Sequence, residues 1–210
     1  MNPTSMKQWV CMFSISAFIC LSASSFLRPA EQVLDVNGKP LETSGAYSIL
    51  PARRGNGGGV NLGDIRYNKT CINGAIQDPN SKASGFPVLI SPLGADAIRV
   101  SSGLNIYFAF ALVLLAPSNS TSCGWKTPVW QISLDKRTKQ QLVILGGEEG
   151  SGDPSSVCKI MKLDKDYAFQ FCPRVCPTCR VICRYVGIFN DNGVRRLALQ
   201  DAPFRVKFSP

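Results

Sequence analysis

The chain has 210 residues, a formal net charge of +9 from 23 basic and 14 acidic residues, and 45% hydrophobic residues, but it has no histidine. The lack of histidine excludes Ser-His-Asp and Cys-His catalysis, HExxH zinc sites and histidine proton relays. Neither a GxSxG nucleophile elbow nor a Walker loop is present in the sequence. We therefore expect a protein that is not an enzyme and that holds no cofactor and no metal.

The N-terminus has the pattern of a secretory signal peptide. Lys7 precedes an apolar run at residues 10–21, and the small residues Ala23 and Ser25 follow where a cleavage site is expected. The run is too short to span a bilayer as a mature helix. We therefore expect a signal peptide at residues 1–25 and a single domain at residues 26–210, secreted to the cell exterior or carried to the vacuole by the secretory pathway.

Short alternations of apolar and polar residues follow along the chain, separated by turn signals, which is typical of an all-β domain. They predict strands around residues 47–51, 104–108, 129–134 and 204–208. The apolar run 108–116 is too short for a membrane span and predicts a buried strand.

Glycine-containing segments supply the turns between these strands. Turns are expected at Asn73-Gly74 and at Asp191-Asn192-Gly193. The glycine-rich stretch 55–59 is interpreted as a flexible strand connection, because no GK[ST] sequence or helix-like segment follows it, as a phosphate-binding loop would need.

Cysteines are concentrated near the C-terminus. Four of them fall within twelve positions: Cys172, Cys176, Cys179 and Cys183. Their spacing alone allows a metal knuckle or a nested pair of disulfides, and the oxidising secretory environment favours disulfides. Removing the signal peptide leaves seven of the nine cysteines, so one thiol stays free or pairs with another molecule.

A weak internal repeat concerns Cys158. Residues 157–160 are similar to residues 129–132, and the repeat places Cys158 where its counterpart is Trp130. This predicts a thiol that points inward, is partly buried and is therefore unreactive. Repeated short strands also suit a closed or pseudo-symmetric β architecture, which leaves few exposed edges.

The positive charge is dispersed along the chain. Basic pairs occur at residues 53–54, 136–137 and 195–196, far apart in sequence, and no aromatic residues interleave with them as a base-stacking platform would need. We therefore expect a solvated basic surface, with no nucleic-acid partner and no membrane partner.

Two long segments resemble the signatures of one family. Residues 33–59, VLDVNGKPLETSGAYSILPARRGNGGG, are similar to the opening signature of plant Kunitz-type protease inhibitors, and residues 185–208, YVGIFNDNGVRRLALQDAPFRVKF, are similar to their closing signature. The cluster FCPRVCPTCRVICR resembles that of the miraculin-like branch. The resemblance spans essentially the whole mature chain and implies a disulfide-stabilised β-trefoil of twelve strands with pseudo-threefold symmetry.

The resemblance also implies how the cysteines pair. The family suggests bridges between Cys71 and Cys123, between Cys172 and Cys183, and between Cys176 and Cys179. Cys158 is then the free thiol of a monomer, and a disulfide-linked dimer through Cys158 is the alternative.

The activity implied by the resemblance is substrate-like inhibition of a serine endopeptidase. An exposed loop enters the protease cleft in extended form, and a rigid loop loses little entropy on docking. The resemblance places this loop at Ser91, Pro92, Leu93, Gly94, Ala95 and Asp96. The specificity residue is then Gly94 or, with a shift of one residue, Leu93, and the residue that supports the loop is Thr43.

This loop departs from the pattern of a trypsin inhibitor. Trypsin requires Arg or Lys at the specificity position, and Arg99 lies past the loop, where strand alternation should begin. Thr43 stands where the family usually has a loop-supporting asparagine, and a hydroxyl has a shorter reach and fewer donors than an amide. We therefore expect a secreted serine endopeptidase inhibitor that is not a strong trypsin inhibitor, with Leu93 suited to a chymotrypsin- or subtilisin-like pocket. The first alternative is a miraculin-like defence or binding protein without protease inhibition, and the second is an enzyme or an inhibitor of glycosidases or cysteine proteases.

Two sequons, Asn68-Lys69-Thr70 and Asn119-Ser120-Thr121, lie shortly before Cys71 and Cys123. They predict glycosylation at Asn68 and Asn119, with unmodified Asn-Thr turns as the alternative.

Overall fold

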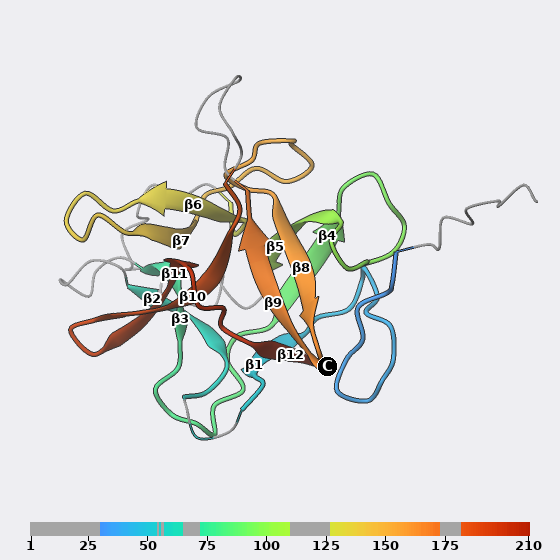
Figure 1. The fold of residues 1–210 in the computed structure, drawn as a ribbon, viewed down its shortest axis with the longest axis horizontal. Helices are drawn as coiled ribbons and strands as arrows, with labels where there is room; N and C mark the ends of the chain where they lie inside the picture. Colours follow the sequence, from blue (N-terminus) through green and yellow to red (C-terminus); the bar gives the residue numbers. More distant parts are fainter. Residues whose placement is uncertain (1–29, 54, 56, 65–71, 110–126, 173–181) are drawn as a thin grey trace, which may run out of the picture.

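A computed structural model describes residues 30–53, 55, 57–64, 72–109, 127–172 and 182–210. The regular elements in these ranges are all strands, as the alternating sequence pattern predicts. They are β1 (Ser48–Pro51), β2 (Val60–Asp64), β3 (Ile72–Gln77), β4 (Val88–Pro92), β5 (Gly103–Phe108), β6 (Trp130–Leu134), β7 (Gln141–Leu145), β8 (Cys158–Leu163), β9 (Asp166–Phe171), β10 (Arg184–Asp191), β11 (Val194–Gln200) and β12 (Val206–Ser209) (Figure 1).

Neighbouring strands in the sequence form antiparallel pairs. These are β2 with β3, β4 with β5, β6 with β7, β8 with β9, and β10 with β11, while β1 pairs with β12 and so joins the two ends of the domain. β3, β7 and β11 also pair with one another in a closed ring. Two-stranded units arranged around such a threefold ring form a β-trefoil, so the predicted fold class is confirmed.

Aromatic side chains from several units meet in the core. The Phe108, Trp130, Phe169 and Phe208 rings follow one another with centroids 5.7–6.0 Å apart and tilted or edge-to-face planes. Each of these side chains is buried, because it lies on the inward face of its strand. Their contacts tie β5, β6, β9 and β12 together, and edge-to-face pairs add about 0.5–1.5 kcal/mol each beyond the burial of apolar area.

The predicted turn at Asn73-Gly74 is wrong, because both residues lie inside β3. Gly74 pairs with Gly63 in β2 and with Ile144 in β7, at the threefold ring. Asn73 is 7% exposed. Packing at the ring therefore overrides the local turn preference. The turn at Asn192-Gly193, in contrast, joins β10 to β11 as predicted, and both residues have positive φ.

Gly58 and Gly59, directly before β2, are closely packed, although the sequence predicted a flexible connection. Gly58 and Gly59 are buried, and their N–H groups donate to Asp78 O and Ala83 O. A Cβ atom at Gly59 would lie 2.1 Å from Ser84 O. Glycine is therefore required here for the close approach of two backbone segments.

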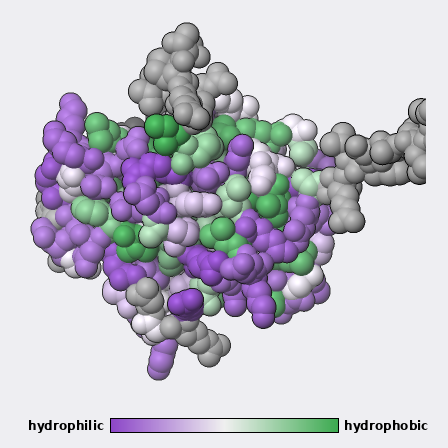
Figure 2. All heavy atoms as spheres, in the orientation of Figure 1, coloured by the Kyte–Doolittle hydropathy of each residue, from purple (hydrophilic) through white to green (hydrophobic). Residues whose placement is uncertain are grey.

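The surface of the described residues is mixed in character. In Figure 2 hydrophilic side chains cover most of the visible face, and the hydrophobic ones form separate small areas. Within the described ranges no helix has the length and apolar character needed to cross a membrane.

Candidate functional site

The predicted docking segment lies at the end of β4 and at the start of the β4–β5 connection, residues 93–102 (Figure 1). Ser91 and Pro92 are the last residues of β4 and pair with Asn105 and Leu104 of β5. Leu93 N–H donates to Gly103 O over 2.9 Å, which closes the strand pair. Beyond this bond, residues 94–96 are exposed, so they form the tip of the loop.

The second half of this connection is tied to the rest of the domain. Ile98 is buried, and its carbonyl accepts from Val33 N–H over 3.1 Å. Val100 N–H donates to Glu31 O, and Ser101 N–H donates to Ile160 O, both over 2.8 Å. The backbone is therefore well anchored between residue 98 and the start of β5.

Arg99 belongs to this anchored segment. It lies past residues 91–96, as expected, but the expectation that strand alternation begins there is wrong, because β5 begins only at Gly103. Arg99 makes an isolated bridge with Gln32, and its guanidinium donates to Ala30 O over 3.0 Å. The only basic residue of the connection is thus held by the N-terminal segment and is not at the loop tip.

The loop tip is not fully extended. Gly94 has φ of +65°, in the left-handed region, and a Cβ atom there would have open space around it. The Leu93 side chain is half-buried, with Cδ1 3.6 Å from the Cβ position of Gly103. Because a protease cleft binds an extended chain, docking of this segment requires a backbone change at Gly94.

Thr43, the predicted support of the loop, lies in an exposed turn before β1. The turn is closed by Gly45 N–H, which donates to Glu42 O over 3.0 Å. The Tyr47 hydroxyl accepts from Glu42 N–H over 2.8 Å. Among the hydrogen bonds of the described residues, none joins Thr43 to the β4–β5 connection.

Sequence reasoning missed a second loop beside the first, the β7–β8 connection at residues 146–157. Asn105, which the alternation of β5 places on the polar face, is fully buried. Its amide nitrogen donates to Ser156 O, and its amide oxygen accepts from Gly150 N–H, each over 2.9 Å. A Cβ atom at Gly103 would lie 3.3 Å from Val157 Cγ1. An asparagine that alternates with apolar strand residues does not reveal this junction in the sequence, because its partners lie some fifty residues later in the chain.

The cysteines occupy two kinds of environment. Cys172 and Cys183 are joined by a disulfide, which links the end of β9 to the start of β10. Cys158 is a free and fully buried thiol in β8, and burial raises its pKa. Such a thiol is unreactive in the folded protein, because the thiolate is the nucleophile.

Several predicted features lie outside the described residues. They are the signal peptide, the glycosylation sites Asn68 and Asn119, and the cysteines of the other two predicted bridges: Cys71, Cys123, Cys176 and Cys179. Among the residues that the structure describes, no group of three or more His, Cys, Asp or Glu side chains is arranged to hold a metal ion.

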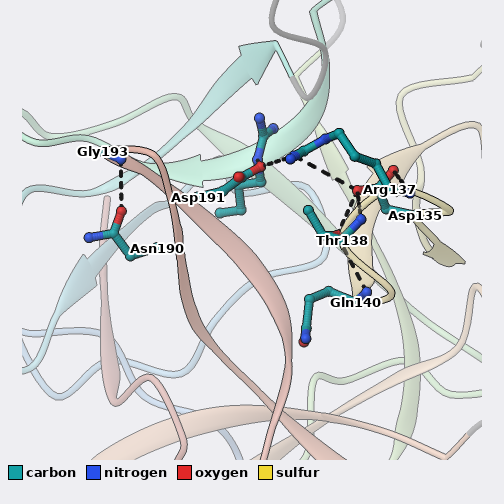
Figure 3. A network of polar contacts seen from close by, with 8 residues as sticks. Asp135, Arg137, Thr138, Gln140, Asn190, Asp191 and Gly193 are labelled. Carbon is teal, nitrogen blue, oxygen red and sulfur yellow. Dashed lines mark hydrogen bonds and ion pairs between the residues drawn. The ribbon is translucent and has the colours of Figure 1, made fainter.

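Two of the basic pairs contribute to an ion-pair network at the β6–β7 and β10–β11 turns (Figure 3). Arg196 and Asp191 are both buried, with 2.8 Å between Nε and Oδ2. Arg137, which is about half-exposed, also pairs with Asp191. Asp135 accepts from the Thr138 hydroxyl over 2.6 Å and so closes the β6–β7 turn. Arg137 and Arg196 therefore stabilise the fold.

The fold defines a β-trefoil protein, and comparison with known proteins shows the family to which it belongs. The Kunitz legume family, described as "Trypsin and protease inhibitor", matches residues 33–209. Kunitz trypsin inhibitor 5 of Arabidopsis thaliana is 39% identical over 183 residues, covering 85% of this chain and 85% of the relative. Miraculin of Synsepalum dulcificum is 32% identical, covering 94% of this chain and 93% of the relative.

Solved structures give the same result. A Kunitz-type cysteine protease inhibitor from potato has a TM-score of 0.66 and 31% identity, covering 86% of this chain and 97% of that one. Soybean trypsin inhibitor has a TM-score of 0.66 and 26% identity, covering 85% of this chain and 99% of that one. The chain belongs to the plant Kunitz family of protease inhibitors. The family is one of protease inhibitors and not of enzymes, so the prediction that the protein is not an enzyme is confirmed.

Proposed function

We propose that the protein is a secreted Kunitz-type inhibitor of a serine endopeptidase that presents residues 91–96 to the protease cleft. The observation that carries the proposal is the family match over residues 33–209 together with an exposed loop between β4 and β5. The flanking strands support a substrate-like mode, because both loop ends are fixed by strand pairing and by buried anchors. Cut ends held in this way stay in place, so the cleaved bond can re-form.

Leu93 is the side chain best suited to a specificity pocket. It is the only large apolar residue in the predicted docking segment, so it fits a chymotrypsin- or subtilisin-like pocket. Trypsin is a poor target, because neither Leu93 nor Gly94 carries a positive charge to meet an aspartate in the pocket. The left-handed conformation of Gly94 lowers the affinity further, since the loop has to extend before it binds.

A specific observation favours a second candidate function, a miraculin-like binding protein without protease inhibition. Gly94 is left-handed, and no hydrogen bond of the described residues joins Thr43 to the loop, so two features that the predicted mechanism relies on are missing from the free protein. The relatives named above include both inhibitors and miraculin. An inhibitor of cysteine proteases is a third outcome, since one similar structure is described as such an inhibitor.

Secretion is part of the same proposal. The disulfide between Cys172 and Cys183 supports it, because structural disulfides persist in oxidising compartments. Expression of the full chain in plant cells, followed by N-terminal sequencing of the exported protein, tests it. We expect cleavage close to residue 25 and glycans at Asn68 and Asn119.

The function is tested with a panel of chymotrypsin, subtilisin, trypsin and papain against the mature protein. We expect inhibition of chymotrypsin or subtilisin, and a loss of about 10- to 150-fold in Leu93→Ala, because burying a leucine side chain contributes about 1.5–3 kcal/mol. Leu134→Ala is the matched control, since Leu134 is 60% exposed at the end of β6 and should leave inhibition unchanged.

Other outcomes separate the candidates. Inhibition of papain that survives Leu93→Ala would assign the protein to cysteine proteases through another surface. Inhibition of none of the four enzymes by a correctly folded protein would favour the binding-protein alternative.

A further inference from the structure

The β7–β8 connection is held beside the predicted docking loop by one buried side chain. Asn105 lies directly opposite Ser91 in the β4–β5 pair and is fully buried. Both ends of its amide bind the β7–β8 connection, at Ser156 O and at Gly150 N–H. A buried amide with both ends satisfied costs free energy to release, so the two loops form one surface.

Close packing also joins the two loops at Gly103. The Cβ position of Gly103 lies 3.3 Å from Val157 Cγ1 on one side and 3.6 Å from Leu93 Cδ1 on the other. Figure 1 shows the two connections as neighbours, one after the end of β4 and the other before the start of β8. A protein that binds the tip of the first loop therefore approaches the second.

The charge of this surface is opposite to that of the chain. Residues 91–102 and 146–157 contain four carboxylates and a single basic side chain, whereas the whole chain has a net charge of +9. The carboxylates are Asp96, Glu148, Glu149 and Asp153, and all four residues are exposed. The basic residue is Arg99, whose guanidinium is hydrogen-bonded to the N-terminal segment.

We propose that the β7–β8 connection is a second contact segment of the docking face, and that Glu148 and Glu149 select a protease with a basic rim around its cleft. The inference rests on the proposed function of residues 91–96. An acidic patch on an otherwise basic protein attracts a basic rim and turns the patch toward it, which increases the rate of association at low ionic strength. An acidic rim is repelled at the same place.

The probe is chymotrypsin, used both in its native form and with its lysines succinylated. If the panel shows that subtilisin is the inhibited enzyme, subtilisin is used instead. The variant Glu148→Gln/Glu149→Gln removes two exposed charges and keeps the side-chain shape. Asp164→Asn/Asp201→Asn is the matched control, because these carboxylates are 82% and 97% exposed on the β8–β9 turn and the β11–β12 connection.

We expect the loop variant to associate with the native protease roughly 3- to 10-fold more slowly than the wild type in low salt, as rim charges mainly affect association. The difference should shrink on raising the ionic strength above about 0.15 M, where the Debye length is about 8 Å. Succinylation of the protease should slow its association with the wild type, so that the wild type no longer associates faster than the loop variant. The control variant should associate at the same rate as the wild type under all these conditions.

The attachment of the loop is tested separately by hydrogen exchange. Asn105→Ala removes the acceptor for Gly150 N–H, so exchange in residues 148–153 should become faster while the aromatic core stays protected. Unchanged exchange there would overturn the claim that Asn105 holds the loop.

The outcomes also separate this inference from the proposed function. A wild type that inhibits the protease while the loop variant associates equally fast in low salt overturns the second contact segment and leaves the proposed function intact. A wild type that inhibits no enzyme of the panel overturns both.

Discussion

Gly94→Arg tests whether the β4–β5 loop is the docking segment. The substitution places a guanidinium at the predicted specificity position, where it can meet the aspartate of the trypsin pocket. A charged contact of this kind contributes about 2–4 kcal/mol. The structure shows no steric obstacle, because nothing lies within 4 Å of the Cβ position.

The backbone at Gly94 does not reduce that gain. Its φ of +65° costs an L-residue about 1–2 kcal/mol in the free protein, so arginine shifts the loop toward the extended form that docking requires. The gain in trypsin affinity is therefore about 2–4 kcal/mol, or roughly 30- to 1000-fold. Gly94→Ala is the control, because it makes the same change in the backbone without adding a charge.

The assay is titration of trypsin with the wild type and the variants. Gly94→Arg should inhibit more strongly than both the wild type and Gly94→Ala, and adding Thr43→Asn should increase the inhibition if residue 43 reaches the loop on docking. Nanomolar inhibition of trypsin by the wild type would show that another loop carries the activity. Equal inhibition by the Arg and Ala variants would show that residue 94 does not enter the pocket.

Three further predictions concern the scaffold. Arg196→Met removes the buried ion-pair partner of Asp191 and should lower the free energy of unfolding in urea by about 3 kcal/mol. Arg184→Met, which removes an exposed ion pair, should change it by less than about 1 kcal/mol. Burial raises the pKa of Asp135, but hydrogen bonds from Thr138 outweigh this effect, so the pKa lies below its ordinary value of 3.8. Asp135→Asn should therefore lower the free energy of unfolding at pH 7. The difference in this free energy between wild type and variant should diminish as the pH falls below about 4. Cys158 should react with a thiol reagent only after unfolding, and rapid labelling of the native protein would contradict its burial.

The sequence predicted the fold well because its signals were local or belonged to long signatures. Alternation identified the strands near residues 47–51, 104–108 and 129–134, which correspond closely to β1, β5 and β6. The signature segments at the two ends correspond to strands that pair across the molecule, as β1 pairs with β12. A resemblance that covers the two ends and the cysteine cluster could therefore predict the β-trefoil.

The errors have a common physical cause, which is packing between segments distant in sequence. Gly74 lies in a strand because β3 meets β2 and β7 there, and Gly59 is required by the approach of Ser84 O. Asn105 is buried because a loop some fifty residues later in the chain needs its amide. None of these contacts leaves a local pattern.

The docking role of residues 91–96 stays a prediction, and their conformation could not be predicted from the sequence. The resemblance placed residues 91–96 at the end of β4, and the structure shows an exposed tip there. The left-handed φ of Gly94 and the packing of Leu93 near Gly103 depend on the turn that closes the strand pair. Glycine in a sequence allows such a conformation without requiring it.

Cleavage of the loop tests the central claim most directly. The protein is incubated for a long time with a catalytic amount of the protease that it inhibits, and the products are analysed by mass spectrometry. Substrate-like inhibition predicts a single cleaved bond, Leu93–Gly94 or Gly94–Ala95, in a protein whose two fragments stay associated and still inhibit. A single cut outside residues 91–96, or degradation throughout the chain, would contradict it.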